Sequence, residues 1–196
     1  MKNGFLIAGA LAALTLAGCT TTPETHVTRF HLDQRVATGQ IAVEPIRPAD
    51  KGSLEFQTYA SIVGAELARL GFSEAPGLAT SEQVAAIVVE RGSREGLARS
   101  APVTVGIGGG NYGWHGGVGG GISFPIGHAK SDEIVMTRLI VQIKRRSDAS
   151  VVWEGRAETA ARAGSPEADP TATVRRLATA LFKDFPGASG QTVTVK

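Results

Sequence analysis

Residues 133–145 read EIVMTRLIVQIKR, and after a short connection residues 151–161 read VVWEGRAETAA. Apolar or small side chains occupy every second position of both stretches, which is the period of a β-strand with one face on a core. These residues are Val135, Thr137, Leu139, Val141 and Ile143 in the first stretch and Val151, Trp153, Gly155, Ala157 and Thr159 in the second. The pattern predicts a hairpin with residues 146–150 as its connection.

Two other segments have the amphipathic period of α-helices. Residues 53–70 begin with a capping Ser53 and are followed by Gly71, which suits the left-handed end of a helix. The second helix begins after Asp169, a cap, with Pro170 at its first position and a stop at residues 186–187. The expected buried stripes are Phe56, Ala60, Val63, Leu67 and Leu70 in the first helix and Val174, Leu177, Ala178, Leu181, Phe182 and Phe185 in the second.

Further strands are predicted at residues 27–32, 41–46 and 84–90, with an edge strand at 191–196. In the first of these the apolar members are Val27, Phe30 and Leu32, whereas residues 87–89 are three consecutive β-branched residues. Such a continuous run is typical of a central strand. These elements predict an α+β fold, a two-layer sandwich with a mostly antiparallel sheet and both amphipathic helices on one face.

The N-terminus has the pattern of a secretory signal peptide. Lys2 is followed by an uncharged run of 14 residues, 4–17, and then by Gly18 and Cys19, the one cysteine of the chain. A permanent transmembrane helix needs about 20 apolar residues, so this run is too short for one. The alternative of a buried cysteine in a core helix leaves the basic start and the small residues before Cys19 unexplained.

The tetrapeptide Leu16-Ala17-Gly18-Cys19 resembles the lipobox of bacterial lipoproteins. The resemblance implies a diacylglyceryl thioether on Cys19, cleavage between Gly18 and Cys19, and acylation of the new amine. Thr20 resembles the outer-membrane sorting signal of enterobacterial lipoproteins. The expected organisation is a signal peptide at 1–18, a lipidated tether at 19–25 and a domain at 26–196 in the periplasm.

Charge argues against binding to nucleic acid. Removing residues 1–18 from the 196 leaves 178 residues with 19 basic and 18 acidic side chains. A balance of +1 gives no long-range attraction to polyanions. The pairs Arg145-Arg146 and Arg175-Arg176 are most simply solvated, and net charge does not support a contact with lipid headgroups.

Residues 106–121 contain ten of the 25 glycines. They loosely match a dinucleotide fingerprint, but the following residues 122–126 alternate like a strand, whereas the fingerprint needs a helix there. Two interpretations of this excursion stay open. It is a glycine-rich hairpin tip, or it is a contact site for an envelope protein or glycan that uses Tyr112, Trp114 and His115.

The remaining motifs predict no catalysis, no cofactor and no metal. The histidines, at positions 26, 31, 115 and 128, lack the three- or four-residue gap of a helical chelating pair. Residues 187–192 imitate a phosphate-binding loop but have Gln191 where the lysine belongs. No nucleophile elbow occurs, and an acylated Cys19 offers no thiolate.

Several motifs together resemble the bacterial lipoprotein family known as domain of unknown function 4136. They are the lipobox, Leu70-Gly71-Phe72, the aromatic-studded glycine segment, Val151-Val152-Trp153-Glu154-Gly155-Arg156-Ala157 and Asp184-Phe185-Pro186. One departure is Gln83-Val84-Ala85, where the family has an Ala-Asp opening. The resemblance implies a fold and a location but no activity. We therefore expect a non-enzymatic interaction or structural module, anchored by lipid in the outer membrane and facing the periplasm; the alternative is an enzyme acting on envelope glycan or lipid.

Overall fold

The hairpin lies at the centre of a seven-stranded sheet. The computed structural model describes residues 22–32, 36–75, 81–95 and 133–196. Strands β5 (Glu133–Arg145) and β6 (Val151–Arg162) pair antiparallel, with Val141 opposite Gly155 and Leu139 opposite Ala157. The predicted hairpin is confirmed, and its inward face is the one expected, except that Val151 is 43% exposed at the start of β6.

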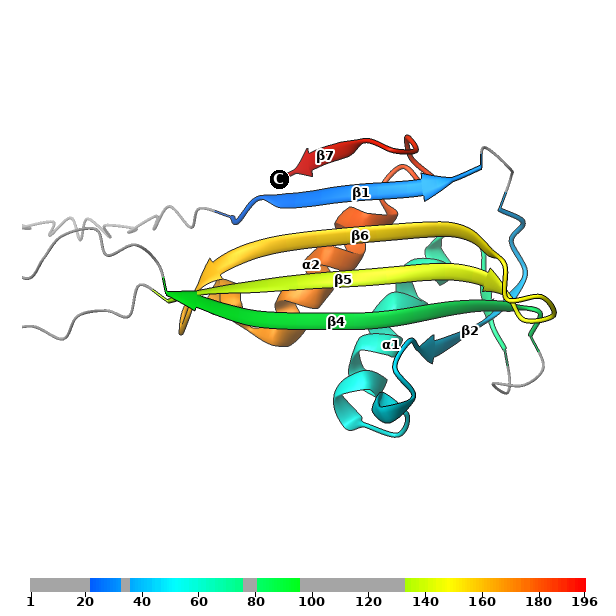
Figure 1. The fold of residues 1–196 in the computed structure, drawn as a ribbon, viewed down its shortest axis with the longest axis horizontal. Helices are drawn as coiled ribbons and strands as arrows, with labels where there is room; N and C mark the ends of the chain where they lie inside the picture. The colour runs from blue at the N-terminus through cyan, green and yellow to red at the C-terminus, as the bar shows by residue number, and fades with distance from the viewer. Residues whose placement is uncertain (1–21, 33–35, 76–80, 96–132) are drawn as a thin grey trace, which may run out of the picture.

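The other strands extend the sheet on both sides in the order β3-β2-β4-β5-β6-β1-β7 (Figure 1). Their bounds are β1 (Thr25–His31), β2 (Gln40–Pro45), β3 (Ser73–Glu74), β4 (Gln83–Glu95) and β7 (Thr192–Val195). Strand β2 runs parallel to β3 and β4, whereas the pairings from β4 to β7 are antiparallel. The α+β class is confirmed, but the sheet is mixed, and the prediction of a mostly antiparallel sheet is wrong.

The parallel pair follows from the connection between its strands. After β2 the chain passes through helix α1 (Leu54–Arg69) and the short β3, and it enters β4 at the end of the sheet where β2 begins. A helical crossover of this kind is the usual connection between parallel strands.

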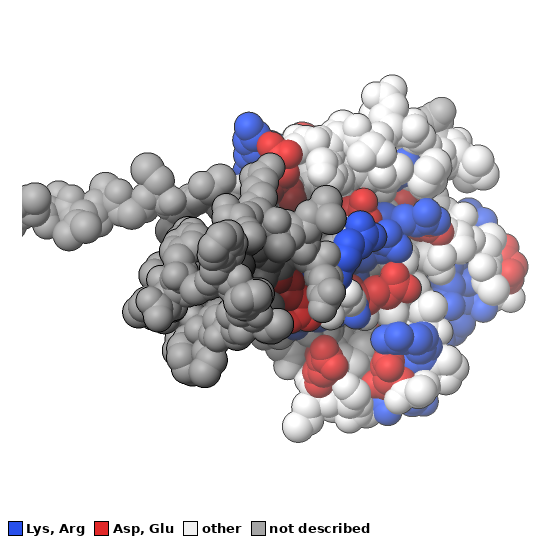
Figure 2. Space-filling view, turned by 60° about the vertical axis from the view of Figure 1, so that its left-hand side comes forward, with Lys and Arg blue, Asp and Glu red and all other residues white. Residues whose placement is uncertain are grey.

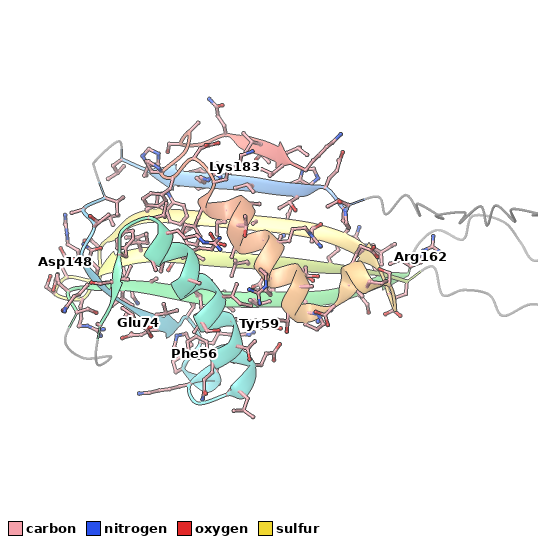
Figure 3. The ribbon with its side chains drawn as sticks, turned by 180° about the vertical axis from the view of Figure 1, so that it is seen from behind. Phe56, Tyr59, Glu74, Asp148, Arg162 and Lys183 are labelled. Atoms are coloured by element: carbon pink, nitrogen blue, oxygen red, sulfur yellow. The ribbon has the colours of Figure 1, made fainter. Side chains whose placement is uncertain are left out.

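Both helices lie on one face of the sheet, behind it in Figure 1 and in front of it in Figure 3. Helix α1 begins where Ser53 accepts a hydrogen bond from the Phe56 N–H at 3.1 Å, and it is followed by Gly71 with φ +92°. Helix α2 (Pro170–Phe182) begins where Asp169 accepts from the Ala172 N–H at 2.8 Å. Each helix is preceded by a short 3₁₀ turn, Pro48–Asp50 and Pro166–Ala168.

The core lies between this face of the sheet and the helices. Trp153 is fully buried and stacks on Phe182 with ring centroids 5.7 Å apart, and its indole N–H donates to the Pro186 carbonyl at 3.0 Å. The stripe of α1 is rotated from the prediction, because the buried residues are Tyr59, Ile62, Val63, Glu66 and Leu67. Phe56, Ala60 and Leu70 are only partly buried against the core.

Strand β1 agrees with its predicted apolar residues only at Val27, which is fully buried. Phe30 and Leu32 are 45% and 79% exposed, whereas Arg29, on the same face as Val27, is buried. The Arg29 guanidinium donates to the main-chain carbonyls of Ala180, Leu181 and Lys183 at 2.9–3.0 Å. Burial lowers the pKa of Arg29, and the nearby Asp184 carboxylate opposes this effect. The inward arginine thus satisfies the last carbonyls of α2, which no helical N–H can reach.

Several predicted features lie outside the described residues. They are the signal peptide 1–18, Cys19 and the first part of the tether 19–25, and the excursion 106–121 with Tyr112, Trp114 and His115. Within the described ranges no helix is long and apolar enough to cross a membrane.

Candidate functional site

A groove of about 700 Å³ lies where the two helices meet both ends of the domain. One wall comes from the last turn of α1 and another from the solvent side of α2. Pro23 and Thr25, at the entry of the chain, and Val195 and Lys196, at its end, complete the lining. Strands β1 and β7 hold these two ends together, because Thr25 pairs with Val195. We refer to this cavity as the terminal groove.

Glu66 connects the two helices in the terminal groove. Its Oε1 accepts a hydrogen bond from Thr179 Oγ1 of α2 at 2.8 Å and forms an ion pair with Arg69 Nη1, also at 2.8 Å. Glu66 is only 9% exposed. A buried carboxylate needs such partners, so its negative charge is already balanced within the protein.

Basic side chains dominate the rest of the lining. Arg175 and Lys183 lie four residues either side of Thr179, on the same side of α2, and both are exposed. Neither forms an ion pair with a carboxylate within the described residues. Arg176 donates from Nη2 to the Glu167 carbonyl at 3.3 Å, and its buried Nε–H has no acceptor in the described part of the chain. Lys196 lies 3.9 Å from the Glu24 carboxylate, and both side chains are largely exposed.

Between these charges the walls are apolar, and they include Leu70, Phe182 and Val195. The terminal groove therefore combines five cationic side chains, one neutralised carboxylate and an apolar surface. Such a lining is suited to an anion that carries an apolar part. Catalysis by a general acid and a general base would need unpaired titratable groups that converge, and the groove's carboxylate is already paired with Arg69.

The sheet face away from the helices has a different electrostatic character. Figure 2 shows acidic and basic side chains alternating over part of it. Arg138 lies between Glu90 and Glu158 at 3.4 and 2.9 Å, and Arg156 contacts Glu154 at 2.6 Å. Exposed pairs of this kind are worth about 0–1 kcal/mol each. Because opposite charges neutralise each other there, this face offers less attraction to a charged ligand than the terminal groove.

A second, small cavity of about 50 Å³ lies beside Tyr59 on α1. The Tyr59 hydroxyl donates to Glu55 Oε1 at 2.8 Å. Tyr59 is labelled on α1 in Figure 3. Burial, assisted by this hydrogen bond and the Glu55 charge, raises the pKa of Tyr59 to about 12. The phenol is therefore neutral at physiological pH, and the cavity is too small for an organic ligand.

The histidines and the turn at residues 187–192 have structural contacts. His26 Nδ1 lies 3.2 Å from Thr194 Oγ1, and His31 Nε2 lies 2.9 Å from the Gly187 carbonyl. In the same turn Ser189 Oγ donates to the His31 carbonyl at 2.9 Å. His115 and His128 lie outside the described residues. Across the described ranges, no three His, Cys, Asp or Glu side chains gather as metal ligands.

The sequence does not predict the terminal groove as a site. It indicates only a solvated pair at Arg175 and Arg176, and no motif marks Glu66, Lys183 or Lys196. One local signal was present, because residues 175, 179 and 183 repeat at helical spacing with a basic residue at each end. The sequence carries no comparable signal that the two ends of the domain lie side by side.

Comparison with known proteins places the chain in a family. The model of the domain of unknown function DUF4136 matches residues 30–187. An uncharacterized protein of Zymomonas mobilis subsp. mobilis is 32% identical in an alignment that is 210 positions long. The alignment spans 87% of this chain and 79% of that protein.

Two solved structures have weaker likeness. A PDZ domain protein from Parabacteroides distasonis has a TM-score of 0.49 and 14% identity, over 88% of this chain and 39% of that one, so the chain spans well under half of its length. The PelC dodecamer from Paraburkholderia phytofirmans has a TM-score of 0.39 and 12% identity, over 81% of this chain and 91% of that one. On the evidence of the family model and the Zymomonas relative, the chain belongs to the DUF4136 family.

Proposed function

We propose that this protein is a bacterial lipoprotein, anchored in the outer membrane through Cys19, whose periplasmic α+β domain is a non-catalytic binding module. The observation that carries the proposal is Leu16-Ala17-Gly18-Cys19 at the end of an uncharged run of 14 residues. Stable anchoring takes more than one acyl chain, since each buried methylene contributes about 0.8 kcal/mol. A cysteine acylated on both its sulfur and its amine meets that requirement.

The position of the first strand supports this arrangement. Strand β1 begins at Thr25, six residues after Cys19, and Pro23 already lines the terminal groove. Pro23 is the fourth residue after Cys19, and four extended residues span at most about 14 Å. An anchor at Cys19 therefore holds the terminal groove close to the membrane surface.

The glycine-rich excursion remains a second contact region in this proposal. Residues 96–132 join the ends of two adjacent antiparallel strands, because Glu95 of β4 pairs with Glu133 of β5. The chain therefore leaves and re-enters the described domain at the end of this strand pair. A partner protein or glycan of the envelope suits exposed aromatic side chains.

Metabolic labelling with a palmitate analogue tests the anchor. Wild-type protein should carry the label and fractionate with the outer membrane, whereas Cys19→Ala should be unlabelled and accumulate as an uncleaved precursor. Thr22→Ala, a matched change three residues further on, should behave as the wild type does. Equal labelling of wild type and Cys19→Ala would refute the lipoprotein proposal. Crosslinking in intact cells followed by purification would then identify what the anchored module contacts.

A further inference from the structure

We propose that the terminal groove binds the phosphate headgroup of an anionic phospholipid in the membrane to which the chain is anchored. This inference rests on the proposed lipid anchor at Cys19, because the anchor is what brings the groove to a bilayer. It adds a ligand and a binding site to that proposal.

The charge of the terminal groove is the first argument. The lining has five cationic residues, and only two of them, Arg69 and Lys196, face a carboxylate within 4 Å. Arg175 and Lys183 remain for a ligand, whereas Arg176 already donates to the Glu167 carbonyl. The mature chain is nearly neutral as a whole, so this excess is a local property of one surface and not a consequence of a basic protein.

Arg175 and Lys183 lie on one side of α2, each four residues from Thr179. They are eight residues apart, about 12 Å along the helix axis, a gap that the two long side chains can close around one phosphate group. Arginine binds phosphate through two parallel N–H donors, and lysine acts as a point charge.

The position of the groove selects a lipid as the source of the phosphate. Pro23 on its wall is within about 14 Å of Cys19 by chain length alone. The potential of an anionic leaflet decays over a Debye length of about 8 Å at physiological salt, so Pro23 lies within about two Debye lengths of the leaflet. The partly buried Leu70 offers an apolar surface to the acyl end of the lipid, which inorganic phosphate lacks.

Vesicle binding tests the inference without the anchor. The chain from residue 19 onward, made with Cys19→Ser so that it carries no acyl group, is mixed with vesicles of phosphatidylcholine alone or of phosphatidylcholine with phosphatidylglycerol. We expect it to sediment with the anionic vesicles and not with the neutral ones. A basic residue near an anionic surface changes the partition by about fivefold, so Arg175→Gln/Lys183→Gln should weaken binding by about 25-fold.

The matched control is Lys51→Gln/Arg145→Gln, which removes the same charge from two exposed positions outside the groove. Lys51 precedes α1, whereas the groove contacts the opposite end of that helix. By contrast, Lys183, which the test variant changes, lies at the end of α2, beside β1 (Figure 3). The control should bind anionic vesicles as well as the parent does. Thermal unfolding of both double variants checks that each is folded.

Two results would overturn the inference. They are equal binding to neutral and anionic vesicles, and an equal loss of binding in the control variant. Failure of the anchor is distinguishable from both, because palmitate labelling reports on Cys19 whatever the vesicles show.

Discussion

Trp153→Ala tests the packing on which the core depends, and Gly155 makes the test specific. Both residues lie on the inward face of β6. A methyl group added at Gly155 would overlap the Trp153 ring and lie 2.7 Å from Leu181 Cδ1. Glycine is therefore required at 155 because the indole of Trp153 occupies the space where a Cβ would be.

The magnitudes follow from the contacts. Trp153→Ala removes a fully buried indole that stacks on Phe182, which costs about 3–5 kcal/mol in free energy of unfolding. It also leaves the Pro186 carbonyl without its donor, which costs about 1 kcal/mol more. Gly155→Ala alone should cost about 3 kcal/mol by overpacking. Where residue 153 is already alanine, the same change should cost about 1 kcal/mol, because only the flexible end of Leu181 must move.

Urea unfolding of the four proteins in this double-mutant cycle measures the coupling, with Trp153→Phe as a milder replacement if the alanine variant does not fold. Such domains have only about 5–15 kcal/mol of stability, so the milder variant keeps the cycle measurable. We expect the two changes to be about 2 kcal/mol less damaging together than their sum. Strict additivity would refute the explanation of Gly155, and an unchanged stability of Trp153→Ala would refute the placement of this face in the core.

Three further predictions concern other parts of the fold. Arg29→Met should lower the free energy of unfolding by about 3 kcal/mol in urea titrations, because it leaves three carbonyls at the end of α2 without a donor; an effect below 1 kcal/mol would contradict this. The pKa of Tyr59 is raised from 10 to about 12, so the unfolded chain loses the phenol proton at a lower pH than the folded protein does. The stability of the wild type relative to Tyr59→Phe should therefore fall between pH 10 and pH 12. The absorbance difference between the two proteins should titrate near pH 12, and titration near pH 10 would contradict the burial of the phenol. Replacing residues 108–121 with an Asn-Gly turn should shift Tm by only a few degrees, because β4 and β5 stay paired up to Glu95 and Glu133; an unfolded variant would show that the segment is packed.

Much of the fold was predictable because its signals are local. Alternation identified β5 and β6, and the caps Ser53 and Asp169 identified where the helices begin. These features depend on residues a few positions apart. The parallel direction of β2 relative to β4 agrees with the helix that joins them, whereas the hairpin of β5 and β6 indicates only antiparallel neighbours.

The failures involve residues whose role depends on distant parts of the chain. Arg29 points inward because the end of α2, about 150 residues later, presents carbonyls to it. Val27, two residues before Arg29, is on the same inward face, but a charged residue after it and the apolar Phe30 beside Arg29 suggest the opposite orientation. The terminal groove was unpredictable for the same reason, since its walls come from both ends of the domain and from two helices.

The most direct test of the lipid anchor is the intact mass of the protein purified from the membranes of its own cells. We expect a chain that begins at Cys19 and carries a diacylglyceryl group and one further acyl chain, with no free thiol. The mass of the unmodified chain from residue 1, or of a chain whose Cys19 reacts as a free thiol, would contradict it.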